Sequence, residues 1–438
     1  MVRLLSFRGG IHPPEKKELA KEAGLSYLQL PEIAYVFLSN HAGAPAKCVV
    51  KENDQVKTGQ VIAEPGGFIS AYVHSPLTGV VKKVDKIYHP IQGRPMEAIV
   101  IQRTADDEWQ YLEHSDWENL SKEQLVDVVK RAGIVGLGGA MFPTHVKLSP
   151  PADKKIDTFI VNAAECEPYL TVDHRLMLER AQDLILGVKI VMKILQVQKA
   201  YIGIESNKVD AYNQLKSILN SDQIELKLLK TKYPQGAEKQ LIYSITGRKV
   251  PVGGLPMDVG VVVQNVQTVV AIKEAVVDRK PLVQRGITIS GEGVNKPINV
   301  VARIGTTVEE LLKHAGGIKE EAERVILGGP MTGIAINRLD IPIMKGTSGI
   351  TVLLKEKEYV QKSCIRCSKC VFACPMGLQP YLLYLLANKR RYDDAVEEGL
   401  FSCIECGSCA YVCPSKIDHV RAIKLAKKVY QALRGGKK

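Results

Sequence analysis

The sequence predicts a multidomain protein of α/β and α+β class, and three observations lead to this prediction. The chain has 438 residues, which is enough for several folded domains. Its first part carries short Val- and Ile-rich runs between turn residues, and its middle alternates strand-like and helix-like segments. Its last part carries two cysteine repeats. Such different patterns in succession are typical of domains with separate cores.

The changes in pattern divide the chain into five parts. Hydrophobic residues make up 45% of the chain and charged residues 24%, so folded cores are expected throughout. The expected parts are a polar lead-in at 1–30, an all-β module at 31–110, an α/β domain at 115–282, a β-containing module at 285–350 and a helical cysteine-rich domain at 355–438.

The all-β module contains two segments that resemble the halves of the barrel-sandwich hybrid of biotinyl and lipoyl carrier domains. These segments are Lys57–Ala63 and His74–Val81. A carrier domain needs an exposed lysine at the hairpin tip between the halves. Residues 64–71 contain no lysine, so we expect a structural role and no swinging arm.

A glycine-rich loop follows the helix predicted for residues 121–132, which has Ser121 as its N-cap and Gly133 as its stop. The loop at 136–139 follows a helix and lacks the third glycine of the G-x-G-x-x-G pattern, so it does not fit the dinucleotide fingerprint. It can still cradle a phosphate, because glycines allow close approach of the backbone and Lys147 adds a positive charge.

Polar residues follow two predicted buried strands of the α/β domain. Residues 162–168 come directly after the strand predicted at 157–161, and a second polar run occupies 264–268. Ligands bind at the carboxyl ends of strands in α/β sheets, so both runs are candidate site segments. For Glu165 and Glu167 a solvated loop is the alternative.

Two copies of the phrase C-x2-C-x2-C-x3-C-P lie at 364–375 and 403–414. This run holds [4Fe-4S] clusters, and in two-cluster proteins the fourth Cys of each run binds the other cluster. Zinc sites or disulfides are the alternatives, but zinc sites rarely use this spacing. We expect two [4Fe-4S] clusters, the first held by Cys364, Cys367, Cys370 and Cys413 and the second by Cys403, Cys406, Cys409 and Cys374.

Four segments of the α/β domain together resemble the flavin-binding subunit of respiratory complex I. They read G-L-G-G-A-M-F-P-T-H-V-K-L, N-A-A-E-C-E-P, Y-P-Q-G-A-E and V-V-Q-N-V-Q-T. With the carrier-like module before them and the cysteine repeats after them, the whole chain resembles the RnfC family of Rnf complex subunits. Four residues replace polar residues of complex I, so no polar contact is implied there: Leu137, Ala164, Ala237 and Gln264.

The resemblance implies a non-covalent FMN in a Rossmann-like domain and a neighbouring site for NAD(H). No catalytic side chain is implied, because the cofactors supply the reactivity. The implied FMN site comprises Gly136, Gly138, Gly139, Lys147, Asn162, Tyr233, Gly236, Asn265 and Thr268, with Lys147 at the phosphate. The implied NAD(H) site comprises Phe142, Glu165, Glu167 and Glu238.

The two C-terminal parts are also similar to known modules. Residues 285–350 resemble the soluble-ligand-binding β-grasp (SLBB) domain, and nothing in this module looks catalytic. Helical segments are expected at Tyr381–Ala387 and Tyr392–Val396, between the cysteine runs. We therefore expect an α-helical ferredoxin domain at 355–438.

The implied function is that of the NAD(H)-reacting electron-transfer subunit of a ferredoxin:NAD+ oxidoreductase that transports H+ or Na+. The implied partners are other membrane and iron-sulfur subunits, with ferredoxin reached indirectly and no nucleic acid. The chain has no run of about 18 uninterrupted apolar residues, as a membrane span requires. We therefore expect a peripheral protein at the cytoplasmic face of the membrane.

Two other families share parts of this pattern. NAD-linked flavin subunits of hydrogenases or formate dehydrogenases typically end in one cluster motif. The first subunit of the sodium-pumping NADH:quinone oxidoreductase lacks the ferredoxin repeats. The eight cysteines of the two motifs count against both alternatives.

Overall fold

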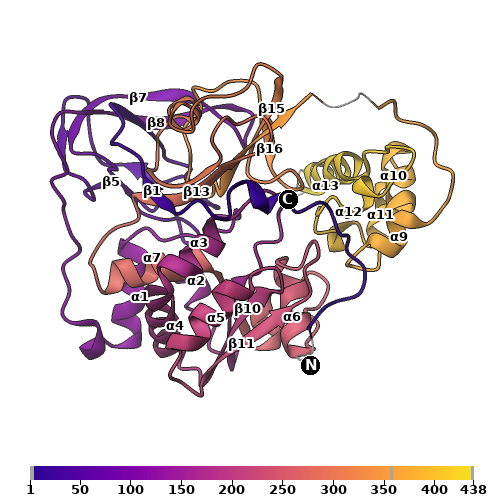
Figure 1. Cartoon of the computed structure of the whole chain (residues 1–438), viewed down its shortest axis with the longest axis horizontal. Coiled ribbons are helices and arrows are strands. Elements are labelled where there is room, and N and C mark those ends of the chain that lie inside the picture. Colours follow the sequence, from indigo (N-terminus) through magenta and orange to yellow (C-terminus); the bar gives the residue numbers. More distant parts are fainter. Residues whose placement is uncertain (1–3, 356–358, 436–438) are drawn as a thin grey trace.

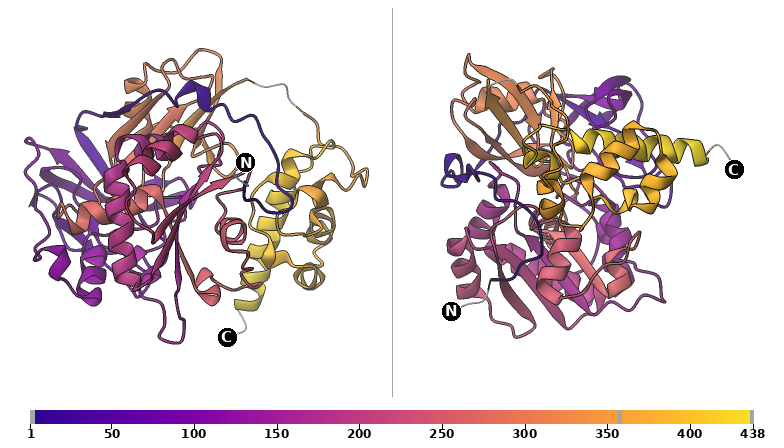
Figure 2. Two further views of the ribbon diagram at one scale, coloured as in Figure 1. Left: turned by 60° about the horizontal axis from the view of Figure 1, so that its bottom comes forward. Right: turned by 90° about the vertical axis from the view of Figure 1, so that its right-hand side faces the viewer.

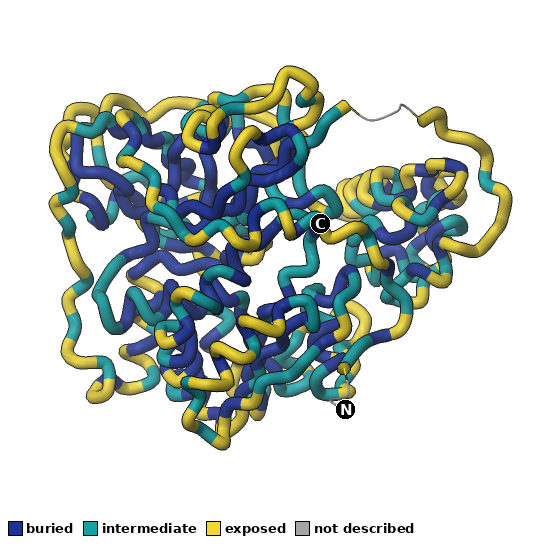
Figure 3. Tube along the Cα trace, viewed as in Figure 1, coloured by how far each residue is buried: buried dark blue, intermediate teal, exposed yellow. Residues whose placement is uncertain are grey.

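The computed structural model describes residues 4–355 and 359–435, which form four β-sheets and a small helical domain (Figure 1). The parallel sheet with its helices lies below the two β-rich parts in this view, and the helical domain lies to one side. Buried residues run through the sheets and the helices against them (Figure 3). Among the described residues, no helix is both long and apolar enough to cross a membrane.

The β-module consists of two antiparallel sheets around one apolar core, as the alternation of Val and Ile with polar residues predicts. Ile62, Leu77 and Ile101 are fully buried in this core. The strands of the larger sheet are β2 (Ile33–Phe37), β8 (Arg94–Arg103), β7 (Gly79–His89) and β4 (Gln55–Val56). Those of the smaller sheet are β3 (Lys47–Cys48), β5 (Val61–Glu64) and β6 (Val73–His74).

The α/β domain has a four-stranded parallel sheet with helices on both faces. Successive strand residues point to opposite faces, so Phe159 packs with α4 on one side while Ile160 packs with α6 on the other. The strands in spatial order are β11 (Ile224–Leu229), β10 (Lys199–Glu205), β9 (Thr158–Ala163) and β12 (Val261–Asn265). The helices are α1 (Lys122–Arg131), α2 (Thr144–Lys147), α3 (Val172–Glu179), α4 (Ala181–Leu195), α5 (Val209–Ile218), α6 (Glu238–Thr246) and α7 (Val266–Val276).

Helix α1 begins and ends as the sequence predicts. The Ser121 hydroxyl accepts a hydrogen bond from the N–H of Gln124, whose side chain accepts one from the N–H of Ser121, which completes a capping box. Gly133 follows the helix with a φ of 66°, in the left-handed region that glycine adopts without strain. The chain therefore enters the glycine-rich loop from a well-defined helix end.

The domain that the sequence predicts to be an SLBB domain is built on a mixed six-stranded sheet, and one of its strands comes from the N-terminal part of the chain. Strand β1 (Leu25–Tyr27) pairs in parallel with β14, so the described part of the expected lead-in, residues 4–30, contains regular structure. A three-residue strand gives no recognisable period in the sequence. The other strands are β13 (Gln284–Ser290), β14 (Ile298–Arg303), β15 (Ala322–Leu327), β16 (Ile334–Ile336) and β17 (Gly349–Leu354), with helix α8 (Val308–His314) against them.

The predicted ferredoxin domain is helical, as expected, and the N-terminal segment runs along it before reaching the six-stranded sheet (Figure 2). The N–H of Gly10 donates to the carbonyl of Ala373, next to a predicted cluster ligand. The helices are α9 (Lys369–Ala373), α10 (Pro380–Asn388), α11 (Tyr392–Glu397), α12 (Ser408–Tyr411) and α13 (His419–Gly435). Four short 3-10 helices lie at Lys17–Leu19, Trp117–Asn119, Pro256–Val259 and Leu400–Ser402.

Lys345 joins three domains by a buried amine. It belongs to the SLBB domain, and its Nζ donates to the carbonyl of Tyr72 in the β-module (2.9 Å) and to that of Gly133 in the α/β domain (2.7 Å). Its backbone N–H donates to the side chain of Asn40 (2.8 Å). Burial lowers the pKa of Lys345 to about 7.

We expect Lys345→Met to destabilise the protein, because two carbonyls lose their donor. The cost is about 1–3 kcal/mol for the buried carbonyl of Gly133 and less for the half-buried carbonyl of Tyr72. The difference in stability between the wild type and the variant should grow from pH 7 to pH 9. Over this range the unfolded lysine stays protonated while the folded one loses its proton, so the wild type gains stability with pH and the variant does not. Apparent melting temperatures at both pH values check this, with the exposed Lys319→Met as control. A deficit that shrinks at pH 9 would contradict the prediction.

Candidate cofactor sites

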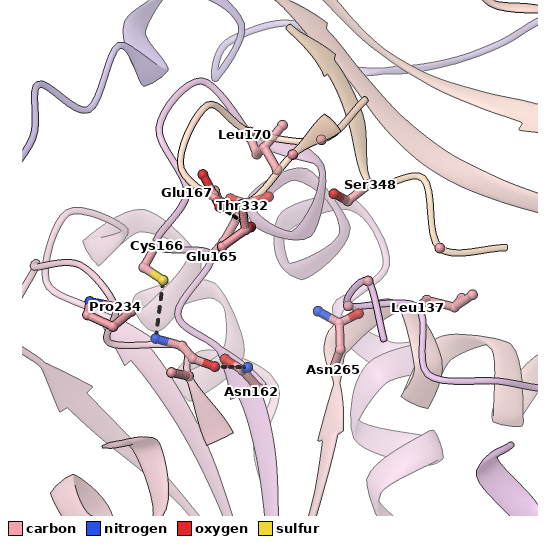
Figure 4. A pocket seen from close by; sticks show the side chains of 18 of the residues that line it. Leu137, Asn162, Glu165, Cys166, Glu167, Leu170, Pro234, Asn265, Thr332 and Ser348 are labelled. Carbon is pink, nitrogen blue, oxygen red and sulfur yellow. Dashed lines mark hydrogen bonds between the residues drawn. The ribbon is translucent and has the colours of Figure 1, made fainter. Parts of the chain in front are cut away.

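The carboxyl ends of β9 and β12 lie side by side at the point where the strand order of the parallel sheet reverses. Asn265 pairs in register with Asn162, so the two predicted polar runs leave the sheet next to each other. A cavity of about 510 Å³ opens above this edge (Figure 4). Its volume falls in the range of roughly 300–1,000 Å³ that is usual for cofactor and ligand sites.

The glycine-rich loop forms one wall of the cavity and is fixed from behind. The N–H of Leu137 donates to the buried hydroxyl of Thr268 at the start of α7 (2.9 Å). Gly139 has a φ of 110° and no atom within 4 Å of the position a Cβ would occupy. The loop therefore presents an open stretch of backbone to the cavity, as expected for a cradle.

The structure brings together most of the residues that the sequence predicts for the two sites. Those that line the cavity are Gly138, Gly139, Asn162, Tyr233, Gly236, Asn265, Glu165, Glu167 and Glu238. Among the described residues, four predicted ones do not line the cavity: Gly136, Phe142, Lys147 and Thr268.

Lys147 is paired with a carboxylate in this structure. Its Nζ lies 2.8 Å from Oε1 of Glu238, which lines the cavity, and donates to the carbonyl of Val263 (3.3 Å). The side chain of Lys147 is 30% exposed. Its predicted contact with a phosphate stays a prediction, and it would require the amine to turn from Glu238 toward the cavity.

The two asparagines at the strand ends hold neighbouring loops. The side-chain amide of Asn162 donates to the carbonyl of Gly236 (2.8 Å), and that of Asn265 donates to Asp173 (2.6 Å). Asp173 also lines the cavity, and the sequence analysis did not single it out. Its burial in the first turn of α3 raises its pKa, a feature that appears only in the folded chain.

The two predicted nucleotide-facing carboxylates bind backbone and side-chain donors of the protein. The Glu165 carboxylate accepts from the N–H groups of Asp173 (2.6 Å) and His174 (3.4 Å), at the start of α3. Burial raises the pKa of Glu165 to about 7. The Glu167 carboxylate accepts from the N–H of Met331 (3.1 Å) and from the hydroxyl of Thr332, both in the SLBB domain.

Lys17 holds the backbone of the loop that carries these carboxylates. Its buried Nζ donates to the carbonyls of Glu165 (2.8 Å), Glu167 (3.0 Å) and Leu170 (2.5 Å). Glu165 and Tyr169 have φ values of 48° and 69°, a region that is unfavourable for residues other than glycine. The amine stabilises this conformation. No local sequence signal identifies Lys17, because its partners are about 150 residues away.

The SLBB domain, to which the sequence analysis assigned no site residue, forms the wall opposite the strand ends. Its contribution comes from the segments that follow β15 and precede β17. The lining residues are Leu327, Gly328, Gly329, Thr332, Gly333, Ile334, Met344, Gly346, Thr347 and Ser348.

The motif cysteines gather around two further cavities, each of which mixes the two runs. One is lined by Cys364, Cys367, Cys370 and Cys413, and the other by Cys374, Cys403, Cys406 and Cys409. Within the described residues, no three His, Cys, Asp or Glu side chains lie close enough to hold a single metal ion. The grouping is compatible with ligand exchange between the runs, although the ligand roles themselves stay a prediction.

The second group of thiols adjoins the large cavity. Ile404 and Cys406 line that cavity, and the Tyr233 hydroxyl donates to the carbonyl of Cys406 (2.7 Å). Lys427 supports the same turn, with its Nζ donating to the carbonyl of Cys403 (2.7 Å) and to the Glu405 carboxylate (2.7 Å). In the first group, by contrast, Cys367 is exposed.

Family models match four parts of the chain. They are described as an RnfC barrel sandwich hybrid domain at residues 5–106, a Nuo51 FMN-binding domain at 129–274, an SLBB domain at 287–335 and a 4Fe-4S dicluster domain at 356–414. These matches confirm the predicted class and kinds of domain. The FMN-binding and dicluster models imply FMN and iron-sulfur clusters as cofactors.

Two relatives are similar over almost the whole chain, and both are the C subunits of their complexes. The one from the proton-translocating ferredoxin:NAD(+) oxidoreductase complex of Clostridium ljungdahlii is 47% identical over 399 residues, which is 90% of this chain and 87% of that protein. The one from the Na(+)-translocating ferredoxin:NAD(+) oxidoreductase complex of Acetobacterium woodii is 44% identical over 427 residues, with coverage of 97% and 96%. This chain belongs to the RnfC family. It is thus part of an ion-translocating ferredoxin:NAD+ oxidoreductase, as the motifs indicated.

The fold of this RnfC family member is shared in part with an NAD+-reducing [NiFe]-hydrogenase in its H2-reduced state. The two structures have a TM-score of 0.50 and 19% identity, over 70% of this chain and 62% of the hydrogenase chain. At this identity the similarity concerns the fold alone.

We expect Lys17→Met to loosen the loop at residues 164–170. A hydrogen bond to a charged group contributes about 1.5–3 kcal/mol, so amide hydrogen exchange in this loop should become faster by about tenfold or more. Lys21→Met, at an exposed position in the same segment, is the matched control. Equal exchange rates in both variants would show that the amine does not hold the loop.

Proposed function

We propose that this chain exchanges electrons between NAD(H) and two [4Fe-4S] clusters by way of a non-covalent FMN bound in the large cavity. One observation carries the proposal. The cavity is bordered both by the loops that resemble those of the FMN-binding family and by Cys406 of the second cysteine run. A flavin in this cavity would therefore have a cluster as its direct neighbour.

The residues present fit these cofactors. The cavity volume of about 510 Å³ and the open backbone at Gly139 suit a flavin, and four thiols surround each of the smaller cavities. Backbone N–H groups of Arg366, Leu378 and Glu405 each lie 3.4 Å from a cysteine sulfur. Such N–H···S contacts are the usual outer partners of cluster ligands.

The protein contributes the positioning of the loops around the cavity. Asn162 and Asn265 fix the strand-end side of the cavity through their hydrogen bonds to Gly236 and Asp173. Lys17 fixes the loop of Glu165 and Glu167 from behind. Bound FMN would supply the conversion between hydride transfer and single-electron transfer.

The arrangement of the thiols supports an order for the two clusters. The group with Cys374 and Cys403 adjoins the large cavity, whereas the group with Cys367 reaches the surface of the ferredoxin domain. We assign the inner group to electron exchange with the flavin and the outer group to exchange with another subunit.

The names of the relatives suggest the partners. We propose that the chain assembles with the membrane and iron-sulfur subunits of its complex, peripherally at the cytoplasmic face of the membrane, and that ferredoxin acts through those subunits. The direction is proposed as reduction of NAD+. The coupling ion is H+ or Na+, as in the two relatives.

The direct test is the composition and reactivity of the protein purified without oxygen. We expect one FMN and about eight iron atoms per chain, the number in two [4Fe-4S] clusters. Addition of NADH should bleach the flavin absorbance. Protein that carries FMN and iron but does not react with NADH would contradict the proposal.

The proposed role of Lys147 predicts weaker FMN binding in Lys147→Ala. Loss of a charge-assisted contact to a phosphate costs about 1.5–3 kcal/mol, so the Kd for FMN should rise by about tenfold or more. Glu238→Gln removes the ion pair but keeps the cation, so it should retain FMN. Fluorescence titration of both flavin-free variants checks this. An equal rise of the Kd for FMN in both variants would assign the effect to the ion pair.

Ligand exchange between the cysteine runs predicts an effect of Cys374→Ala on the cluster of the other run. The paramagnetic signal of the cluster at Cys403, Cys406 and Cys409 should be altered first, while the other signal persists. Cys48→Ala, outside both motifs, is the control. A loss confined to the cluster at Cys364, Cys367 and Cys370 would show that the assignment is wrong.

A further inference from the structure

Two loops of the SLBB domain, residues 327–334 and 344–348, face the strand ends of the α/β domain across the large cavity. We call these loops the roof, and the loops around Gly138, Asn162 and Asn265 the floor. In Figure 4, Thr332 and Ser348 lie on the opposite side of the cavity from Asn162 and Asn265. The cavity is therefore enclosed between two domains.

The roof is fixed to the loop of Glu167 at one end. The Glu167 carboxylate accepts from the N–H of Met331 and the hydroxyl of Thr332. A Cβ at Gly329 would lie only 2.4 Å from Oε2 of Glu167, so no other residue fits there without a shift. The negative charge of Glu167 is thus bound by the roof and does not stand free in the cavity.

The other end of the roof is fixed to the glycine-rich loop. A Cβ at Gly346 would lie 2.5 Å from Cγ of Met141 and 3.1 Å from the carbonyl oxygen of Gly139. The next residue toward the N-terminus, Lys345, is bound to carbonyls of two other domains. With both ends fixed, the spacing between roof and floor is set by the folded protein and not by a ligand.

We infer that the roof is the binding surface for the nicotinamide dinucleotide, which lies over a flavin held by the floor. This inference rests on the proposed function and assigns its substrate site to a second domain. The floor carries the predicted flavin residues, so a second planar ligand has the remaining space between the floor and the roof. Glu167 is then a positioning residue that sets the height of the roof.

The side chains of the roof suit a ligand that enters and leaves. Thr332 is exposed, as are Gly138 and Gly139 on the floor, so the cavity opens between them. Ser348 is partly exposed, and within the described part of the chain its hydroxyl makes no hydrogen bond. A ribose hydroxyl or the nicotinamide carboxamide can use this group.

A larger side chain in the roof should weaken the binding of NAD+ and leave the binding of FMN unchanged. In FMN-loaded, cluster-loaded protein, Ser348→Leu should raise the Kd for NAD+ by about tenfold or more, because the added side chain takes the volume of the ligand. Its FMN content should match that of the wild type. Ser348→Ala removes the hydroxyl without filling space and should raise the Kd by about tenfold at most. Calorimetric titration with NAD+ and flavin absorbance give the two readouts.

A Ser348→Cys variant gives a test that does not depend on tolerance of leucine. NAD+ should protect this cysteine from alkylation in the FMN-loaded protein, as measured on the peptide that contains it. Absence of protection, an unchanged Kd in Ser348→Leu, or loss of FMN with NAD+ binding retained would each overturn the inference. A wild type that holds FMN but binds no NAD+ would instead overturn the proposed function.

Discussion

The parallel pairing of β9 with β12 is the constraint on which the cofactor cavity depends. The chain first adds β10 and β11 on one side of β9 and later returns to add β12 on the other. The strand order reverses at this point, and ligands of open α/β sheets bind there. The register places Asn265 beside Asn162, and the hydroxyl of Thr268 then holds the glycine-rich loop. The loops at this edge meet because they leave neighbouring strand ends.

Buried lysines fix the other parts of the molecule to this edge. Lys17 binds three carbonyls of one loop, and Lys345 binds carbonyls of two domains. A buried amine carries a large desolvation cost, which only well-placed acceptors offset. Each lysine therefore restricts its loop to the geometry in which all of its acceptors are reached. This explains how a cavity between two domains keeps a defined shape.

The contact between the ferredoxin domain and the cavity connects the two kinds of cofactor chemistry. Tyr233 lines the cavity and donates to the carbonyl of Cys406, so the flavin-site wall and the cluster loop share a hydrogen bond. The N-terminal segment also lies against Ala373 of the first cysteine run. The ferredoxin domain is thus positioned by elements from distant parts of the sequence. A fixed distance between the proposed flavin and the inner thiols follows from these contacts.

Family resemblance, carried by the motifs, indicated the kinds of domain. The helix between its N-cap Ser121 and its stop Gly133 and the two cysteine motifs could be predicted directly, because they depend on local caps and ligand spacing. The sequence also identified Asn162 and Asn265, since polar residues at strand ends have a local signal. Other features depend on how the folded chain packs: Lys17 supports the site, Lys147 pairs with Glu238, and the SLBB loops close the cavity. These contacts join distant residues, such as Glu167 and Met331, which are 164 positions apart. No local pattern records such a contact, because it arises from the packing of one domain on another.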